Sequence, residues 1–363
     1  MSAVNPQPAR KYLGDLVEVK AAHRFDTARL ESYLAGAIRD FSGPLTLQQF
    51  ESGQSNLTYL LRTPARTFVL RRKPPGVLLK SAHAVDREYR VMRALWSTGF
   101  PVPEPLILCE DESVAGTMFY VMGYVPGRIF LDCTLPDLTP QHRAAVFDSV
   151  NATLARLNST DYMGLGLADF GKPGNYFARQ ISRWSQQYEA SRTQDIPEME
   201  RLMEWLPQAV PDEQLARLIH GDFSFHNVLV HPSEPRVVAV LDWELSTIGH
   251  PFGDLMYHTM EWYRPAGSDV RGTLAGRDLV ALGIPSFDQY VRTYCERAGL
   301  APPVNAAFYR AYNLFRVAAI KQGIAARARN GTGVSADAAA FAAQVRPLAQ
   351  AAWREAQQAG AEG

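Results

Sequence analysis

Residues 218–244 carry the most informative pattern in the chain and read LIHGDFSFHNVLVHPSEPRVVAVLDWE. Two runs rich in β-branched residues, 228–230 and 237–241, flank the polar segment 231–236. Strand runs separated by such a segment predict a β-hairpin with a longer loop. The hairpin brings together the residues just before its first strand and those just after its second.

Three oxygen-bearing side chains mark the open end of this hairpin. Asn227 precedes the first strand, Asp242 follows the second, and Asp222 lies in the loop leading in, five residues before Asn227. Phosphoryl transfer from a nucleotide needs such a set, because one carboxylate accepts the proton of the attacking hydroxyl and hard oxygen ligands hold Mg²⁺. The pattern therefore indicates Asp222 as the catalytic base and Asn227 and Asp242 as metal ligands.

Two other interpretations of this segment stay open. His220-x-Asp222-x-x-x-His226 could be the metal-ligand cluster of a hydrolase, with Asp242 as a fourth ligand. The segment could also be a purely structural hairpin with solvated acids.

The segment resembles the catalytic loop and metal-binding Asp of the protein-kinase-like fold. His220-Gly221-Asp222 stands in place of His-Arg-Asp and Asp242-Trp243-Glu244 in place of Asp-Phe-Gly, as in the aminoglycoside phosphotransferase branch, which includes choline and homoserine kinases. Four stretches are similar to the kinase-like module fused to some acyl-CoA dehydrogenases: 68–76, 81–89, 175–184 and 241–247. The resemblance covers about residues 25–330.

The resemblance implies an α+β, two-lobed protein-kinase-like fold. Residues 1–124 would form a small antiparallel-sheet N-lobe, with an N-terminal arm and helix, that binds the nucleotide. Residues 125–363 would form a mainly helical C-lobe with the catalytic loop and the acceptor pocket.

Ser55 and Asn56 lie in a small polar loop between two strand patterns, at 45–50 and 57–61. Such a loop could lay its backbone N–H groups over phosphates, as a kinase nucleotide loop does. It contains one glycine rather than three, and an ordinary hairpin turn is the alternative interpretation.

Arg71 lies on the predicted strand 67–72, where the kinase-like fold usually has a phosphate-pairing Lys. An Arg can also pair phosphate oxygens, through a planar fork. Glu88 falls on the apolar stripe of the predicted helix 86–96, and a carboxylate buried there needs a cation or hydrogen-bond donors. Arg71 is its expected partner; the alternative is a Glu88 side chain that reaches solvent from the edge of the stripe.

The predicted strand 118–125 runs into a Gly/Pro segment, where the resemblance places the kinase hinge. Backbone groups of Met122, Tyr124 and Val125 would then bond the adenine edge. The boundary between the lobes is placed here.

The second half of the chain is predicted to be helical, with helices expected at 140–158, 178–191, 286–298 and 305–329. By resemblance, Asp254 ties the backbone of the catalytic loop in place, and His220 orients that loop. Asp169-Phe170-Gly171 spells the kinase magnesium motif but precedes the catalytic loop, so we assign it no metal role.

An aromatic set with nearby arginines suggests an apolar acceptor with an anionic head, such as a hydroxyacyl-CoA. The set comprises Tyr176, Phe177, Trp184, Tyr188, Tyr257, Trp262 and Tyr263, with Arg179, Arg183 and Arg264. Alternatively, the aromatics are core residues and the arginines are solvated.

The amino-acid composition limits the classes of partner that this protein is expected to bind. Lys plus Arg and Asp plus Glu both number 37, which argues against nucleic acid or an anionic membrane as the main partner. The three cysteines show no metal-ligand spacing and are expected to be reduced core thiols. With no apolar run approaching the roughly 18 residues of a membrane span, a cytoplasmic protein is expected. A homodimer is compatible with the sequence.

The sequence thus predicts a small-molecule O-phosphotransferase that moves the γ-phosphate of Mg-ATP or Mg-GTP to an alcohol group. The cofactors would be Mg²⁺ and the nucleotide. A non-catalytic nucleotide-binding scaffold of the same fold and the metallohydrolase remain as alternatives.

Overall fold

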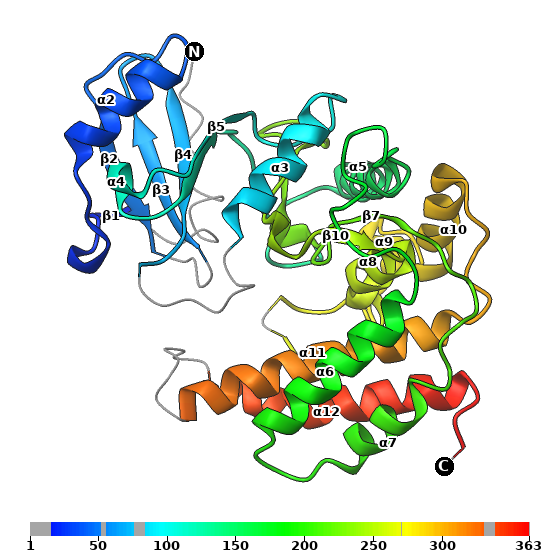
Figure 1. The fold of residues 1–363 in the computed structure, drawn as a ribbon. Coiled ribbons are helices and arrows are strands. Elements are labelled where there is room, and N and C mark those ends of the chain that lie inside the picture. Colours follow the sequence, from blue (N-terminus) through cyan, green and yellow to red (C-terminus); the bar gives the residue numbers. More distant parts are fainter. Residues whose placement is uncertain (1–15, 52–55, 76–83, 270, 330–337, 363) are drawn as a thin grey trace. The chain divides into compact units, whose positions relative to one another are not determined.

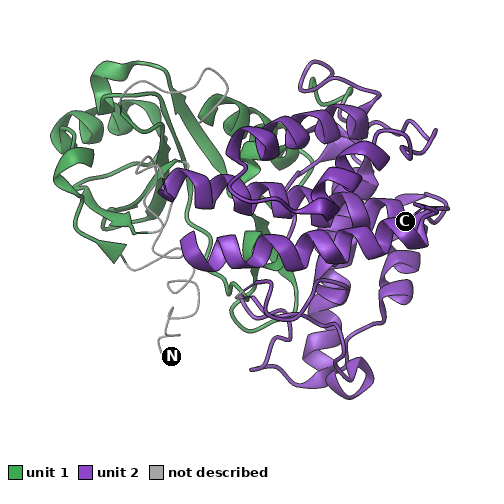
Figure 2. Cartoon of the chain, turned by 90° about the horizontal axis from the view of Figure 1, so that it is seen from below, with its two compact units in different colours: residues 1–130, 163–167, 225–246 green, residues 131–162, 168–224, 247–363 purple. Residues whose placement is uncertain are grey.

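The computed structural model describes most of the chain, namely residues 16–51, 56–75, 84–269, 271–329 and 338–362. The chain forms two compact units (Figure 2). Unit 1 comprises residues 1–130, 163–167 and 225–246. Unit 2 comprises residues 131–162, 168–224 and 247–363. The predicted division of the lobes between residues 124 and 125 stays a prediction.

Unit 1 is built on a six-stranded antiparallel sheet in the order β1-β2-β3-β4-β6-β5 (Figure 1). Its strands are β1 (Leu16–Val17), β2 (Thr46–Phe50), β3 (Leu57–Arg62), β4 (Thr67–Arg72), β5 (Pro105–Cys109) and β6 (Phe119–Gly123). Alternating residues point to one face, where Tyr59 pairs with Leu70 and Leu61 with Phe68, all buried. This face packs against α2 (Thr27–Ala37), through Leu30 and Leu34, and against α4 (Glu112–Ala115).

Helix α3 (Val85–Trp96) is the amphipathic helix predicted from its apolar stripe. Its buried residues recur at helical spacing, at positions 85, 88, 91, 92 and 95. The helix contacts β5, β6 and the short 3₁₀ helix η3 (Trp243–Leu245) that follows the hairpin. Trp243 stacks edge-on against Phe100, just beyond the helix, with ring centroids 6.0 Å apart.

The predicted hairpin is confirmed as β8 (Val228–Val230) paired antiparallel with β9 (Val237–Val240). Val228 lies opposite Val240, and the Leu241 N–H donates to the Asn227 C=O over 2.8 Å. The 3₁₀ helix η2 (Phe225–Asn227) leads directly into β8. The residues that enter and leave the hairpin therefore lie at the same end of it.

Unit 2 is mainly helical. Its helices are α5 (Pro140–Asn158), α6 (Tyr176–Ser191), α7 (Pro197–Trp205), α8 (Pro251–His258), η4 (Thr259–Trp262), α9 (Leu279–Leu282), α10 (Phe287–Ala298), α11 (Ala306–Arg329) and α12 (Ala338–Gln358). Thr139 caps α5 by accepting from the His142 N–H, which confirms the predicted start of that helix. The helix predicted from residue 286 begins at Phe287, with Ser286 forming its capping box, and the one predicted from residue 178 begins at Tyr176. Helix α11 packs against both α6 and α12 (Figure 1).

A two-stranded ladder, β7 (Arg217–Ile219) with β10 (Thr247–Gly249), joins the segments on either side of the hairpin in unit 2. Thr247 lies opposite Ile219, so the start of the catalytic loop is anchored to the segment that enters α8. Gly171 of the Asp-Phe-Gly sequence packs here, since a Cβ on it would lie 2.3 Å from Thr247 Oγ1. All three cysteines are free and buried. In the part of the chain that the structure describes, none of the helices is both long and apolar enough to cross a membrane.

Candidate active site

Arg71, at the fifth position of β4, joins two acids within unit 1. Its Nη1 lies 3.2 Å from Glu88 Oε2, and Nη1 and Nη2 both donate to Asp242 Oδ1 over 3.1 Å. The predicted pair between Arg71 and Glu88 is therefore confirmed. The strand, helix α3 and the end of the hairpin are connected through this one guanidinium, an arrangement that can present it to phosphate oxygens.

Glu88 is fully buried, so the alternative in which its side chain reaches solvent is wrong. Its carboxylate accepts from Asn56 Nδ2 over 2.7 Å and from the Tyr120 hydroxyl over 2.9 Å. Burial raises the pKa of Glu88, and the charge of Arg71 opposes that shift. Asn56, predicted to contact the nucleotide, thus has a second role in holding Glu88. Ser55, predicted beside it, lies outside the described residues.

Tyr120 was missed in the sequence. It lies directly opposite Arg71 in the pairing of β4 with β6, which is why its hydroxyl reaches Glu88. Burial and the neighbouring carboxylate raise the pKa of this hydroxyl, so it stays protonated and donates. The contact between Tyr120 and Glu88 depends on the pairing register of β4 and β6, which the sequence of neither strand determines by itself.

Asp242 leaves the end of β9 with φ 64° and ψ 63°, in the left-handed region that residues other than glycine seldom adopt. Its side chain is 38% exposed, whereas Asn227, which enters β8, is buried. A carboxylate and an amide oxygen are the hard ligands that Mg²⁺ prefers, and the bound phosphates complete such a site. The donor set therefore fits Mg²⁺, and Arg71 is the cation that pairs with Asp242 in this structure.

A double-mutant cycle tests the coupling of Arg71 and Glu88. We expect Arg71→Ala and Glu88→Ala each to raise the nucleotide KM, and the double variant to lose less than the sum, with a coupling of about 0.5–3 kcal/mol. The reason is that either single change leaves a buried partner uncompensated. Steady-state kinetics at varied nucleotide measure it.

The control is a partly exposed ion pair between Lys73, which follows β4 directly, and Asp86 of α3, with Lys73 Nζ 3.7 Å from Asp86 Oδ1. In the double-mutant cycle of this control pair, the losses of the two single variants should be nearly additive, since solvent screens such pairs. Additive losses for Arg71 and Glu88 as well would remove the proposed connection between strand and helix.

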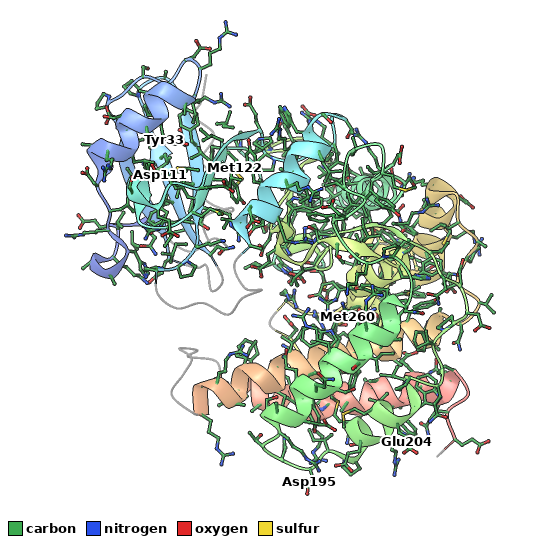
Figure 3. All side chains as sticks on the ribbon, viewed as in Figure 1. Tyr33, Asp111, Met122, Asp195, Glu204 and Met260 are labelled. Carbon is green, nitrogen blue, oxygen red and sulfur yellow. The ribbon has the colours of Figure 1, made fainter. Side chains whose placement is uncertain are left out.

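Of the predicted hinge residues, Met122 lies on β6 (Figure 3), and Tyr124 and Val125 follow the end of that strand. The Gly123 N–H donates to the Glu104 C=O over 2.8 Å, and the Tyr124 N–H donates to the Thr67 C=O over 3.3 Å. The Tyr124 side chain is exposed, and Val125 packs beside Ile129 at the hairpin. Contacts of Met122, Tyr124 and Val125 with an adenine edge stay a prediction.

The predicted catalytic loop follows β7 in unit 2 and is fixed by Asp254 of α8. Asp254 accepts from the His220 N–H over 2.6 Å and from the Gly221 N–H over 2.7 Å, which confirms that it ties the loop backbone in place. Burial raises the pKa of Asp254, while His220 and these hydrogen bonds oppose the shift. His220 is buried, and its Nδ1 accepts from the Asp222 N–H over 3.2 Å, so it also orients the loop.

Arg316, which was missed in the sequence, and Tyr257, which was predicted only as part of the aromatic set, hold the other side of this loop. Buried Arg316 of α11 donates through Nη2 to the Gly221 C=O over 2.7 Å, and its guanidinium lies 4.8 Å from the Tyr257 ring centroid. The Tyr257 hydroxyl forms a hydrogen bond with the Asp222 side chain. Gly221 has φ +84°, a left-handed turn that glycine adopts without strain. Asp222 is thereby presented on a loop clamped from both sides.

Most residues of the aromatic set that was predicted to surround the acceptor lie in the hydrophobic core. Tyr176, Phe177, Trp184, Tyr188 and Trp262 are all buried. Phe177, for example, stacks on rings of α11 because α6 packs along that helix. These five therefore fit the alternative interpretation, in which the aromatics are core residues, and a role around an acceptor stays a prediction. Arg264 is not solvated either, since it is 1% exposed and paired with Glu261 and Asp269.

Within the described residues, no group of three or more His, Cys, Asp or Glu side chains is arranged to hold a metal ion. The hydrolase interpretation, which needs such a cluster, gains no support from the structure. A kinase site shares its metal between two protein ligands and the phosphates.

Unit 1 has an antiparallel sheet in which a strand arginine pairs with a helix glutamate. Unit 2 is helical and holds the His-Gly-Asp loop by hydrogen bonds to its backbone. Together these features define a kinase-like α+β fold. The profile of the family described as "Phosphotransferase enzyme family" (APH) matches residues 46–290. The chain belongs to this aminoglycoside phosphotransferase family, whose members are kinases of small-molecule hydroxyl groups.

The curated relatives are longer proteins. The chain is 46% identical over 325 residues to acyl-CoA dehydrogenase family member 10 of Mus musculus, covering 89% of this chain and 30% of the relative. It is 43% identical over 344 residues to acyl-CoA dehydrogenase family member 11 of Homo sapiens, covering 93% of this chain and 44% of the relative. The chain thus spans less than half the length of these relatives.

Among solved structures, a candidate aminoglycoside phosphotransferase from Ralstonia eutropha is similar with a TM-score of 0.85 and 46% identity, covering 92% of this chain and 99% of that one. Aminoglycoside phosphotransferase APH(4)-Ia, solved with AMP-PNP and hygromycin B, has a TM-score of 0.59 at 18% identity, covering 90% and 98%. At that identity the likeness shows the fold alone.

Proposed function

We propose that this protein transfers the γ-phosphoryl group of Mg-ATP or Mg-GTP to a hydroxyl group of a small molecule. The observation that carries the proposal is the bridge from Arg71 to Glu88 and Asp242 in unit 1. A buried acid that fixes a cation beside a potential metal ligand is suited to holding a metal–phosphate group. A purely structural hairpin would not need this network.

The residues divide the chemistry between them. Asp222 accepts the proton of the acceptor hydroxyl, whose oxygen then bonds the γ-phosphorus as the bond to the leaving nucleoside diphosphate breaks. Asp254 and Arg316 hold the loop that carries Asp222. Arg71 contacts phosphate oxygens, and Glu88 orients it. Asn227 and Asp242 would hold Mg²⁺, which neutralises charge on the phosphates.

For the acceptor we propose a hydroxyacyl-CoA. Support comes from two sides: the relatives are named as acyl-CoA dehydrogenase family members, and in unit 2 the buried Arg316 donates to Gly221 of the catalytic loop. Phosphorylation would turn a poor leaving hydroxyl into a good leaving group for later removal. A polycationic aminoglycoside would instead favour acidic side chains around the acceptor.

The test is a nucleotide-consumption screen of purified protein with Mg-ATP and, separately, Mg-GTP, against hydroxyacyl-CoAs of several chain lengths, sugars and amino alcohols. We expect consumption with a hydroxyacyl-CoA, accompanied by a phosphorylated product. If the protein phosphorylates a sugar or an amino alcohol but no hydroxyacyl-CoA, the proposed acceptor is wrong and the proposed kinase activity stands.

A nucleotide-binding scaffold is the competing function of the same fold. It predicts a rise in melting temperature with Mg-nucleotide but no turnover with any acceptor. The presence of Asp222, Asn227 and Asp242 together weighs against it, since a scaffold needs no base.

A further inference from the structure

Arg71 binds only one of the two carboxylate oxygens of Asp242. Its Nη1 and Nη2 groups both donate to Asp242 Oδ1 over 3.1 Å. Among the described residues, none forms a hydrogen bond or an ion pair with the other oxygen, Oδ2. The Asp242 side chain is 38% exposed, whereas that of Arg71 is 12% exposed. A metal ion that Asp242 binds from solvent therefore shares the carboxylate with the Arg71 cation.

Arg71 is fixed beside Asp242 by its strand and by a buried acid. It lies within β4, opposite Thr58 of β3 on one side and Tyr120 of β6 on the other. Fully buried Glu88 lies 3.2 Å from its Nη1. Burial lowers the pKa of Arg71, but the charges of neighbouring groups, chiefly Glu88, outweigh burial and raise that pKa, so the guanidinium stays charged. Moving the guanidinium away would leave Glu88 buried without its cation, which is costly.

A divalent cation held by Asp242 is repelled by this guanidinium. In the part of the chain that the structure describes, Arg71 is the only Lys or Arg that forms an ion pair with Asp242. Coulombic repulsion between two cations on one carboxylate is strong at such short separations and lowers the affinity for the metal. The effect does not depend on the total charge of the site, to which Glu88 and Glu244 also contribute negative charge. Whatever that total, replacing Arg71 by a neutral residue makes cation binding at Asp242 more favourable.

A nucleotide reverses this effect, because its phosphates are anionic. A guanidinium binds phosphate oxygens through parallel N–H groups, and Mg²⁺ bridges oxygens of the same phosphates. The phosphates thus supply negative charge to both cations, and Arg71 then contributes to binding instead of opposing it. Loss of Arg71 is therefore expected to change the affinity for a free cation and the affinity for a metal–nucleotide complex in opposite directions.

We propose that Arg71 makes the site selective for the metal–nucleotide complex over the free metal ion. Arg71 weakens the binding of a divalent cation alone at Asp242 and strengthens the binding of the same cation together with a nucleotide. Each ligand then raises the affinity for the other by the same factor, as linkage requires. This inference rests on the metal and phosphate roles given to Asp242 and Arg71 in the proposed function, and it adds a reason why metal and nucleotide bind together.

The first measurement is the affinity for Mn²⁺ in the absence of nucleotide, followed by electron paramagnetic resonance. Mn²⁺ replaces Mg²⁺ as the probe because both prefer carboxylate and water ligands. The variant Arg71→Gln/Glu88→Gln removes the cation together with its buried partner, so that Glu88 is not left as an unpaired buried charge. We expect it to bind Mn²⁺ about 10-fold more tightly than the wild type, because one unit charge close to a divalent ion changes its affinity by about this factor even in water. Arg71→Lys, which keeps the charge, should bind Mn²⁺ as weakly as the wild type.

The second measurement is calorimetric titration of the same proteins with Mg-ADP. We expect the double variant to bind Mg-ADP about 10- to 100-fold more weakly than the wild type, since a charge-assisted contact with phosphate is lost. The matched control is Lys73→Gln/Asp86→Asn, which removes the partly exposed ion pair beside the same strand and helix and should change neither affinity. Adding Asp242→Asn to the double variant should abolish the gain in Mn²⁺ affinity.

Opposite changes in the two affinities support the selective role of Arg71, even if product analysis finds no phosphorylated acceptor, in which case only the proposed phosphoryl transfer fails. Equal Mn²⁺ affinity of the wild type and the double variant, or weaker binding of both Mn²⁺ and Mg-ADP by the variant, would overturn this role. A gain in Mn²⁺ affinity that survives Asp242→Asn would also overturn it, since the ion then binds elsewhere. Arg71→Gln alone, with the same expected signs, is the second variant should the double variant fail to show the melting transition of a folded protein.

Discussion

Asp222→Asn is expected to lower phosphoryl transfer by roughly 10²–10⁴-fold while leaving nucleotide affinity nearly unchanged. Asn matches Asp in shape and can still accept the hydrogen bond from Tyr257, but it cannot take the proton of the acceptor hydroxyl. The loop itself should persist, since its backbone bonds to Asp254 and Arg316 do not involve the Asp222 side chain.

The rate of phosphoryl transfer is measured as turnover at saturating substrates, and the nucleotide affinity is measured by calorimetric titration. Asp288→Asn, an exposed acid on α10, is the control for loss of one negative charge and should behave as wild type. A purified Asp222→Asn protein that keeps more than a tenth of wild-type turnover would remove Asp222 from the role of base.

Asp242→Ala should abolish the Mg-dependent part of nucleotide binding, because it removes a charged ligand of the metal that bridges the phosphates. The loss should exceed the roughly 10- to 100-fold that removal of an outer-shell partner costs. Asn227→Ala should weaken binding less, since a neutral amide contributes less to a hard cation.

Asp242→Ala also removes a partner of Arg71, so the titration is run with Mg²⁺ and again with EDTA. Only the difference in nucleotide affinity between the two titrations measures the contribution of the metal. Glu234→Ala, in the exposed turn at the opposite end of the hairpin, is the matched control and should leave the difference intact. A Mg-nucleotide affinity of Asp242→Ala equal to that of wild type contradicts the assignment of Asp242 as a metal ligand.

The sequence predicts those parts of the site that local rules determine. The hairpin follows from two β-branched runs and a polar turn, and its closure alone places Asn227 and Asp242 at one end. The contact between Glu88 and Arg71 could be predicted because a buried carboxylate needs a partner and the strand offered one cation on the expected face.

Other parts depend on contacts that periodicity does not encode. Tyr120 reaches Glu88 through strand register, and Arg316 reaches the Gly221 carbonyl from α11, 95 residues further along the chain. The aromatics of α6 look like a binding wall in the sequence, yet α11 covers them. Which face of an aromatic-rich helix is covered is decided by a partner helix distant in sequence.

The most direct measurement is mass-spectrometric product analysis of wild-type and Asp222→Asn protein incubated with Mg-ATP or Mg-GTP and hydroxyl acceptors of each class. For the wild type we predict a phosphorylated acceptor together with an equimolar amount of nucleoside diphosphate, and for Asp222→Asn neither product above background. A wild-type protein that binds Mg-nucleotide, as shown by its melting temperature, yet forms no phosphorylated product with any of these acceptors would contradict the assignment as a phosphotransferase.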